Sequence, residues 1–119
     1  MKYSMNLREK PFQLMKSGEK TIELRLYDEK RSKLNINDEI EFTCIDSTEE
    51  PIHVRVVGLH RFDSFEELYN VLPLLKCGYT NKTINTADPE DMMQYYSRNE
   101  QSQYGVIGIE IELLDKNQK

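Results

Sequence analysis

The sequence predicts an α+β domain built on a small, mostly antiparallel β-barrel with two or three short helices. Segments that alternate apolar and polar residues, as strands do, outnumber the helical segments, which are short and irregularly placed. No regular strand–helix alternation of the doubly wound kind occurs. The length of 119 residues suits one ordinary domain. We therefore expect a single domain over residues 1–115 and a flexible tail at 116–119.

The first predicted elements are a short helix and the strand that follows it. Pro11 opens one or two helical turns, which end at Ser17 and Gly18, where glycine supplies the left-handed conformation that terminates a helix. From residue 20 to 27 the sequence KTIELRLY alternates. Its apolar residues therefore share one strand face, which we expect to join the core, and its charged residues share the other.

Further strands are predicted at 39–45, 52–59 and 104–114, each with strand-like alternation or an apolar run. The segments 35–38 and 46–51 are rich in Asn, Asp, Ser and Pro, which favour turns, and they precede and follow the first of these strands. The pattern therefore contains four clear strands and leaves room for a fifth.

Two more helices are predicted in the second half of the chain. Ser64 with Glu67 three residues later forms a capping box ahead of an apolar run that ends near residue 72. Asp88 caps a second helix that continues through Tyr96. The segment 73–87 between them has the composition of a loop.

Composition and spacing exclude several classes of site. No run of about 18 apolar residues occurs and the first residues, MKYSMNLREK, are charged, which disfavours membrane spanning and secretion and makes the cytoplasm the expected location. Cys44 and Cys77 lack the spacing of a zinc site or disulfide framework, so we expect reduced, packed thiols. His53 and His60 fall on opposite strand faces by parity, which argues against a shared metal. The sequence indicates neither a metal nor a cofactor.

Charge is distributed unevenly along the chain. The net charge of −5 counts against bulk capture of duplex DNA or anionic membranes. Residues 1–35, however, carry nine Lys or Arg against five acids, a net of +4, which leaves −9 for the remainder. We expect any anion-binding site in this first third, including a possible helical turn at 28–33 (DEKRSK) whose basic residues reach phosphates. The alternative is an ordinary solvated charged face.

The densest polar cluster lies at residues 18–25, GEKTIELR. Glu23 and Arg25 share one strand face with Cα atoms roughly 6.5–7 Å apart, so their tips can meet or grip one ligand. Arginine offers a planar fork to a phosphate or base edge, and a carboxylate accepts from an exocyclic amine. Strict alternation puts Lys20 on the opposite face, unless the strand begins after it or a bulge re-aims it. The alternative is an exposed Glu23–Arg25 pair worth about 0–1 kcal/mol, with Lys20 in solvent.

A second candidate cluster is aromatic. Tyr96, Ser97 and Tyr104, with Tyr95 and Arg98 beside them, combine aromatic rings with a hydroxyl and a cation, a composition suited to stacking a base. The alternative is that the tyrosines pack the last helix onto the sheet.

The stretch PFQLMKSGEKTIELRLYDEKRSKLNINDEIEF carries Gly18, Lys20, Glu23 and Arg25 in a GxKxxExR pattern and resembles the signature of ASCH domains, named for activating signal cointegrator homology. Three later segments are similar to bacterial single-domain members: FEELY at 65–69, YYS at 95–97 and YGVIGIEI at 104–111. The resemblance thus covers essentially the full length. It implies a PUA-like pseudobarrel with a cleft beside the signature strand that binds RNA or a modified nucleoside, lined by the motif's charged residues.

The same resemblance raises enzymatic alternatives. One branch of the family comprises amidohydrolases that deacetylate N4-acetylcytidine, with a lysine at the position of Lys20, a threonine at the position of Glu23 and a glutamate further along. Here a glutamate replaces the threonine, so the covalent route open to threonine is not directly available. Glu90 is the nearest candidate for the downstream glutamate. Other members are reported to cleave RNA.

Three hypotheses follow from the sequence. The leading one is an RNA- or nucleotide-binding domain whose Lys20, Glu23 and Arg25 hold a base or phosphate of single-stranded RNA, a nucleoside or a nucleotide. The second is an enzyme acting on a modified nucleoside or RNA, in which Lys20 activates water and Glu23 shuttles protons. The third is a protein-interaction module whose acidic remainder contacts a basic partner.

Overall fold

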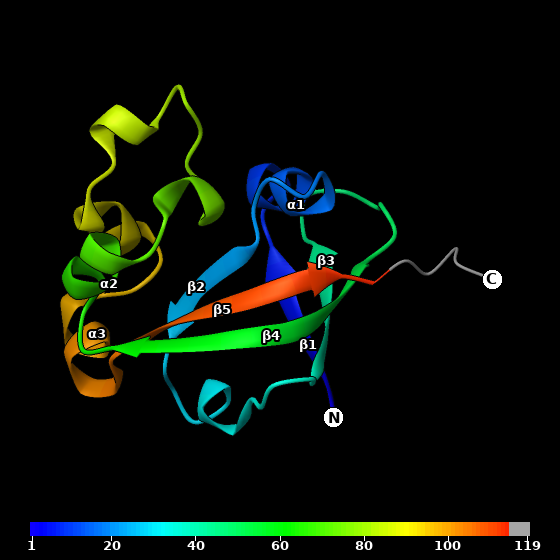
Figure 1. Ribbon diagram of the computed structural model, residues 1–119, viewed down its shortest axis with the longest axis horizontal. Helices are drawn as coiled ribbons and strands as arrows, with labels where there is room; N and C mark the ends of the chain where they lie inside the picture. Colours follow the sequence, from blue (N-terminus) through cyan, green and yellow to red (C-terminus); the bar gives the residue numbers. More distant parts are fainter. Residues whose placement is uncertain (115–119) are drawn as a thin grey trace.

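Five strands form one curled sheet in the computed structural model, which describes residues 1–114 (Figure 1). In spatial order they are β1 (Lys2–Leu7), β3 (Glu39–Cys44), β4 (Ile52–Phe62), β5 (Val106–Leu113) and β2 (Ile22–Leu26). β1 runs parallel to β3, and every other neighbouring pair is antiparallel. The predicted mostly antiparallel α+β fold is therefore confirmed. The tail predicted at 116–119 lies outside the described residues.

The curled sheet is a half-barrel, because its edge strands β1 and β2 do not pair with each other. A side chain spans the gap instead: Arg25 Nη2 on β2 donates to the main-chain oxygen of Asn6 on β1 at 2.7 Å. The opening between these two edges is where the charged face of β2 lies.

The strand boundaries differ from the sequence prediction in several places, and β4 continues to Phe62, three residues beyond the predicted 52–59. β1 was not predicted, although Tyr3, Met5 and Leu7 alternate with polar residues and turn toward the core. β5 begins at Val106 and not at residue 104, because Tyr104 is the last residue of a helix.

Within residues 1–114, three α-helices accompany the sheet: α1 (Glu9–Lys16), α2 (Phe65–Val71) and α3 (Arg98–Tyr104). Pro11 lies inside the first turn of α1, where its missing N–H has no helical partner to lose. Ser64 caps α2 as predicted, accepting from the Glu67 N–H at 3.2 Å. α3 was not predicted, although Ser97 and Glu100 form a capping box at its start.

Short 3₁₀ helices fill the connections: η1 (Arg31–Lys33), η2 (Leu74–Lys76), η3 (Ile84–Thr86) and η4 (Pro89–Gln94). The helix predicted through Tyr96 is thus the 3₁₀ helix η4, capped by Asp88. The predicted loop at 73–87 contains two of these turns, and α2, α3 and this segment lie together at one end of the sheet (Figure 1).

Two apolar clusters form the core. In the first, Phe12 and Met15 of α1 pack on β1, β3, β4 and β5. In the second, the apolar face of β2 packs on Phe65 and Leu68 of α2, as the alternation in KTIELRLY predicts. Complete burial of such side chains contributes about 1.5–3 kcal/mol each. Because α2 takes the apolar face of β2, Glu23 and Arg25 on its other face point to the opening between the sheet edges.

The structure also bears on the expectations for the cysteines, for membrane spanning and for metal binding. Cys44 and Cys77 are both unpaired and buried, which confirms the expectation of packed thiols. Within residues 1–114 no helix is long and apolar enough to cross a membrane, and no group of three or more His, Cys, Asp or Glu side chains could hold a metal ion.

Candidate functional site

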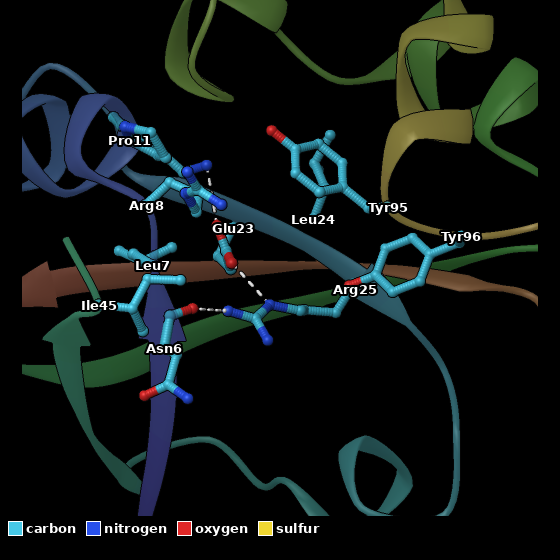
Figure 2. A pocket seen from close by; sticks show the side chains of 11 residues that line it. Asn6, Leu7, Arg8, Pro11, Glu23, Leu24, Arg25, Ile45, Tyr95 and Tyr96 are labelled. Carbon is cyan, nitrogen blue, oxygen red and sulfur yellow. Dashed lines mark hydrogen bonds and ion pairs between the residues drawn. The ribbon is translucent and has the colours of Figure 1, made fainter.

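Three charged side chains of the GxKxxExR motif meet in one buried network (Figure 2). Lys20 Nζ lies 2.8 Å from Glu23 Oε1, and Arg25 Nε lies 2.6 Å from Glu23 Oε2. The side chains of Lys20, Glu23 and Arg25 are 9%, 5% and 14% exposed. The alternative of an exposed surface pair is therefore wrong, because the curl of the sheet covers this face of β2.

Lys20 joins the network because it precedes the strand. β2 begins at Ile22, so the alternation that would place Lys20 on the opposite face does not apply to it. The chain leaves α1 through Gly18, which has φ +88°, and the N–H groups of Glu19 and Lys20 both donate to Leu14 O at 3.0 Å. This turn directs the Lys20 side chain back toward Glu23.

The electrostatics of the network keep Glu23 ionised. Burial raises the pKa of Glu23, but the charges of Lys20 and Arg25 and their hydrogen bonds outweigh it, so the pKa falls below its ordinary value of 4.5. For Arg25, burial lowers the pKa and the Glu23 carboxylate raises it, with a net rise. The network therefore carries two cations and one anion, a net charge of +1.

A cavity of about 210 Å³ opens beside this network (Figure 2). It is lined by Asn6, Leu7, Arg8, Pro11, Lys20, Glu23, Leu24, Arg25, Ile45, Tyr95 and Tyr96. The Tyr96 ring stacks on Phe65, with ring centroids 6.2 Å apart and planes 15° from parallel. Burial raises the pKa of Tyr96, so its hydroxyl is neutral at physiological pH. We call this cavity the first hollow; it combines cations, apolar surface and two tyrosines.

A second cavity, of about 230 Å³, adjoins the first and is called here the second hollow. The two share Pro11, Lys20, Leu24 and Tyr95 as lining residues. Its other wall carries a chain of hydroxyls: Tyr69 and Tyr79 hydroxyls lie 2.7 Å apart, and Tyr79 donates to Asp91 Oδ2 at 2.6 Å. Lys20 therefore lines two adjoining spaces.

The family model of the ASCH domain matches residues 5–115 of the chain, in agreement with the signature residues and the surrounding fold. The chain belongs to the ASCH domain family. ASCH domains have a PUA-like fold and are generally RNA-binding. This confirms the resemblance seen in the sequence.

Solved structures support the same assignment. The ASCH chain resembles the crystal structure of hypothetical protein PH0355, with 33% identity and a TM-score of 0.81, covering 96% of this chain and 100% of that one. The solution structure of PF0455 from Pyrococcus furiosus is 32% identical with a TM-score of 0.72, covering 97% and 99%. An ASCH domain from Lactobacillus crispatus, 12% identical over 94% and 79% of the two chains, shares the fold with a TM-score of 0.62. No protein with a curated description matches the chain.

The ASCH structure separates the predicted aromatic cluster. Tyr96 lines the first hollow. Ser97 caps α3, accepting from the Glu100 N–H at 3.1 Å, and Tyr104 ends the same helix. Neither Ser97 nor Tyr104 is among the residues of 1–114 that line either hollow. Ser97 and Tyr104 therefore serve the two ends of α3 and do not join the charged motif.

The structure also shows where Glu90 and the segment 28–33 lie. Glu90 pairs with Arg98 at 2.6 Å on the surface and is not among the described residues lining either hollow, so it does not join Lys20. The helical turn expected within 28–33 exists as η1, but its Arg31 is engaged by Asp28 at 3.0 Å.

The sequence interpretation missed several lining residues of this ASCH domain. Asn6 lies in the unpredicted strand β1, and Arg8 is the residue that follows the end of this strand. Tyr79 and Asp91 come from the segment after α2, which meets the motif only in the folded chain. One local signal existed: the segment contains Gly78, and glycine is the residue that adopts a positive φ, here +119°.

Proposed function

We propose that this ASCH domain binds single-stranded RNA by holding a base or nucleotide in the first hollow, beside Lys20, Glu23 and Arg25. The observation that carries the proposal is the buried network with a net charge of +1 on the wall of an aromatic-lined cavity. In such a site charged donors act in a low dielectric, where each hydrogen bond is stronger than at the surface. We place this function in the cytoplasm, which suits a chain with two unpaired buried thiols.

The network leaves donors for a ligand. Lys20 uses one of its three N–H bonds on Glu23, and Arg25 Nη1 has no hydrogen-bond partner within residues 1–114. Phosphate oxygens and the carbonyl edges of bases accept from such groups. Tyr95 and Tyr96 add ring surface on which a base can stack, worth about 1–3 kcal/mol per base.

The geometry favours binding over the amidohydrolase alternative. Both carboxylate oxygens of Glu23 already accept from cations, and its pKa is lowered. A general base works best with a pKa near the operating pH and with a lone pair directed at the substrate. Glu23 has neither property, so its role here is to hold Lys20 and Arg25 in place.

The test compares two variants that remove the same charge. Lys20→Ala removes the buried cation, and Lys2→Ala removes an exposed one at the start of β1. Affinity is measured by fluorescence anisotropy with a mixed-sequence pool of labelled single-stranded RNA octamers, after thermal melting confirms that both variants fold. We expect Lys20→Ala to weaken binding about tenfold or more and Lys2→Ala by less than about threefold. Equal affinities for the two variants would overturn the proposal.

A separate arm addresses hydrolysis. The protein is incubated with N4-acetylcytidine at high protein concentration and the products are separated by chromatography. We expect no release of cytidine. Release that is lost in Lys20→Ala would show the enzymatic alternative to be the correct one.

A further inference from the structure

Each hollow alone is smaller than a typical ligand site, but the two together reach that size. Ligand pockets typically enclose roughly 300–1,000 Å³. The hollows measure about 210 and 230 Å³ and share four lining residues. A ligand that uses both must therefore extend past Lys20 and Tyr95, which line both hollows.

Cations lie where the two hollows meet. Lys20 lines both, Lys10 lines the second, and Arg8 lines the first with its Nε 3.1 Å from Asp46 Oδ2, which leaves its two Nη groups for a ligand. Figure 2 shows Arg8 and Pro11 on one side of the first hollow and Tyr95 on the other. A phosphodiester group attracts such cations. The junction therefore suits the phosphate that links two nucleosides.

The far wall of the second hollow has a fixed hydrogen-bond direction. A phenol has one proton, and Tyr79 donates its proton to Asp91 Oδ2 at 2.6 Å. The 2.7 Å contact between the two tyrosines must then have Tyr69 as its donor. Both phenol protons are thus used within the protein, and Tyr69 offers a ligand only its oxygen lone pairs.

The protonation states of Tyr69 and Tyr79 also make this wall an acceptor of hydrogen bonds. Burial raises the pKa of Tyr69 to about 12 and also raises that of Tyr79, so both phenols are neutral. Asp91 Oδ2 accepts from Tyr79 and from the Asp88 N–H, but Asp91 Oδ1 has no partner within residues 1–114. The tyrosine–aspartate wall therefore presents acceptors, which disfavours phosphate and favours a ligand hydroxyl.

We infer that the cleft formed by the two hollows takes two consecutive ribonucleotides. One base lies in the first hollow and the linking phosphate lies at Lys20. The next ribose lies in the second hollow, where its 2′-hydroxyl donates to Asp91. This inference rests on the proposed function and names its ligand class: single-stranded RNA in preference to DNA or a mononucleotide. Inside a nucleic-acid chain, the 2′-hydroxyl is the group that lets a protein tell RNA from DNA.

The unmodified protein gives the first test. Calorimetric titrations use three probes: ribotrinucleotides, the matching deoxyribotrinucleotides with deoxyuridine for thymidine, and the ribonucleoside 5′-monophosphates. A hydrogen bond to a charged acceptor predicts that the ribotrinucleotide binds about tenfold or more tightly than its deoxy counterpart. The monophosphates should bind more weakly than the ribotrinucleotide by at least a similar factor.

Variants identify the acceptor. In Asp91→Asn one oxygen still accepts from Tyr79 and Asp88, while the new amino group cannot accept from a hydroxyl. We expect the ribo-to-deoxy ratio of affinities to fall to about one, with deoxy binding unchanged. Glu90→Gln is the matched control, because this neighbouring carboxylate is exposed and paired with Arg98. It should leave the ratio intact.

The outcomes separate the inference from the proposed function. If ribo- and deoxyribotrinucleotides bind equally and Lys20→Ala weakens both, the inference is wrong and the proposed function stands. If none of the probes and no RNA octamer binds, the proposed function itself is wrong. Should Asp91→Asn fail to fold, the ribo-to-deoxy comparison on the unmodified protein decides by itself, because equal affinities there overturn the inference.

Discussion

Arg25 joins the two edges of the sheet by donating Nη2 to the main-chain oxygen of Asn6, at 2.7 Å across the gap between β2 and β1. The same guanidinium binds Glu23 through Nε. One side chain therefore bonds a carbonyl of an unpaired strand edge and completes the charged network. This double role makes the motif arginine part of the fold as well as of the candidate site.

Arg25→Lys should destabilise the protein although it keeps the charge. The ammonium group is a single point and cannot reproduce the planar fork that reaches Glu23 and Asn6 together. We expect the free energy of unfolding to fall by about 1–3 kcal/mol in urea denaturation, with faster amide exchange in β1. The control is Arg55→Lys in the exposed pair with Glu112, where the change should stay within about 1 kcal/mol. An equal loss in both variants contradicts the bridging role.

Glu23→Gln should cost about 3–5 kcal/mol of unfolding free energy at pH 7, because it leaves two buried cations without their counter-charge. The folded pKa of Glu23 lies below 4.5, so the stabilisation is complete above that pH and is lost as the pH falls through the folded value. The difference between the parent and this variant should therefore shrink below pH 4.5. A difference that does not change with pH would show that Glu23 is not ionised in the folded protein.

Two glycines with positive φ give a matched pair. A Cβ at Gly78, with φ +119°, would lie 3.5 Å from Lys20 Nζ and 3.7 Å from its Cδ, whereas a Cβ at Gly18, with φ +88°, meets nothing within 4 Å. Both alanine variants should lose about 1–2 kcal/mol of stability from backbone strain. Gly78→Ala alone should also weaken RNA binding, measured by anisotropy, because its methyl would rest against Lys20 Nζ at van der Waals distance and cover part of this donor. Unaltered binding by Gly78→Ala would remove this segment from the site.

Cys77 should be unreactive in the folded protein despite its place on the second hollow. Burial raises its pKa to about 11, so almost no thiolate exists at pH 8. Iodoacetamide followed by mass spectrometry should label it slowly at pH 8 and rapidly once urea unfolds the chain. Fast labelling of the native protein would contradict the burial of this thiol.

The sequence was most informative where a pattern is local. The alternation in KTIELRLY places Ile22 and Leu24 against the core and brings Glu23 beside Arg25, as the structure shows. The capping pattern at Ser64 likewise identified α2. Lys20 could be assigned only conditionally, because its direction depends on where β2 begins, and backbone bonds to Leu14 decide that.

What the sequence could not predict depends on contacts between distant segments. The burial of Glu23 results from the curl of the sheet, which no local period reveals. Tyr79 and Asp91 reach the cleft because the segment after α2 folds back onto Lys20, with the Thr21 N–H donating to Lys76 O at 2.8 Å. α3 was missed although a capping box marks it, because Tyr104 was interpreted as part of the following strand.

Amide chemical-shift mapping tests most directly whether the cleft beside Lys20 is the RNA-binding surface. Uniformly ¹⁵N-labelled protein is titrated with a single-stranded RNA octamer. We predict that the largest shifts fall on residues 6–8, 20–25, 78–79 and 91–96, and that Lys20→Ala abolishes them at the same RNA concentration. Shifts gathered on β4 between 52 and 57, with residues 20–25 unmoved, would contradict the account.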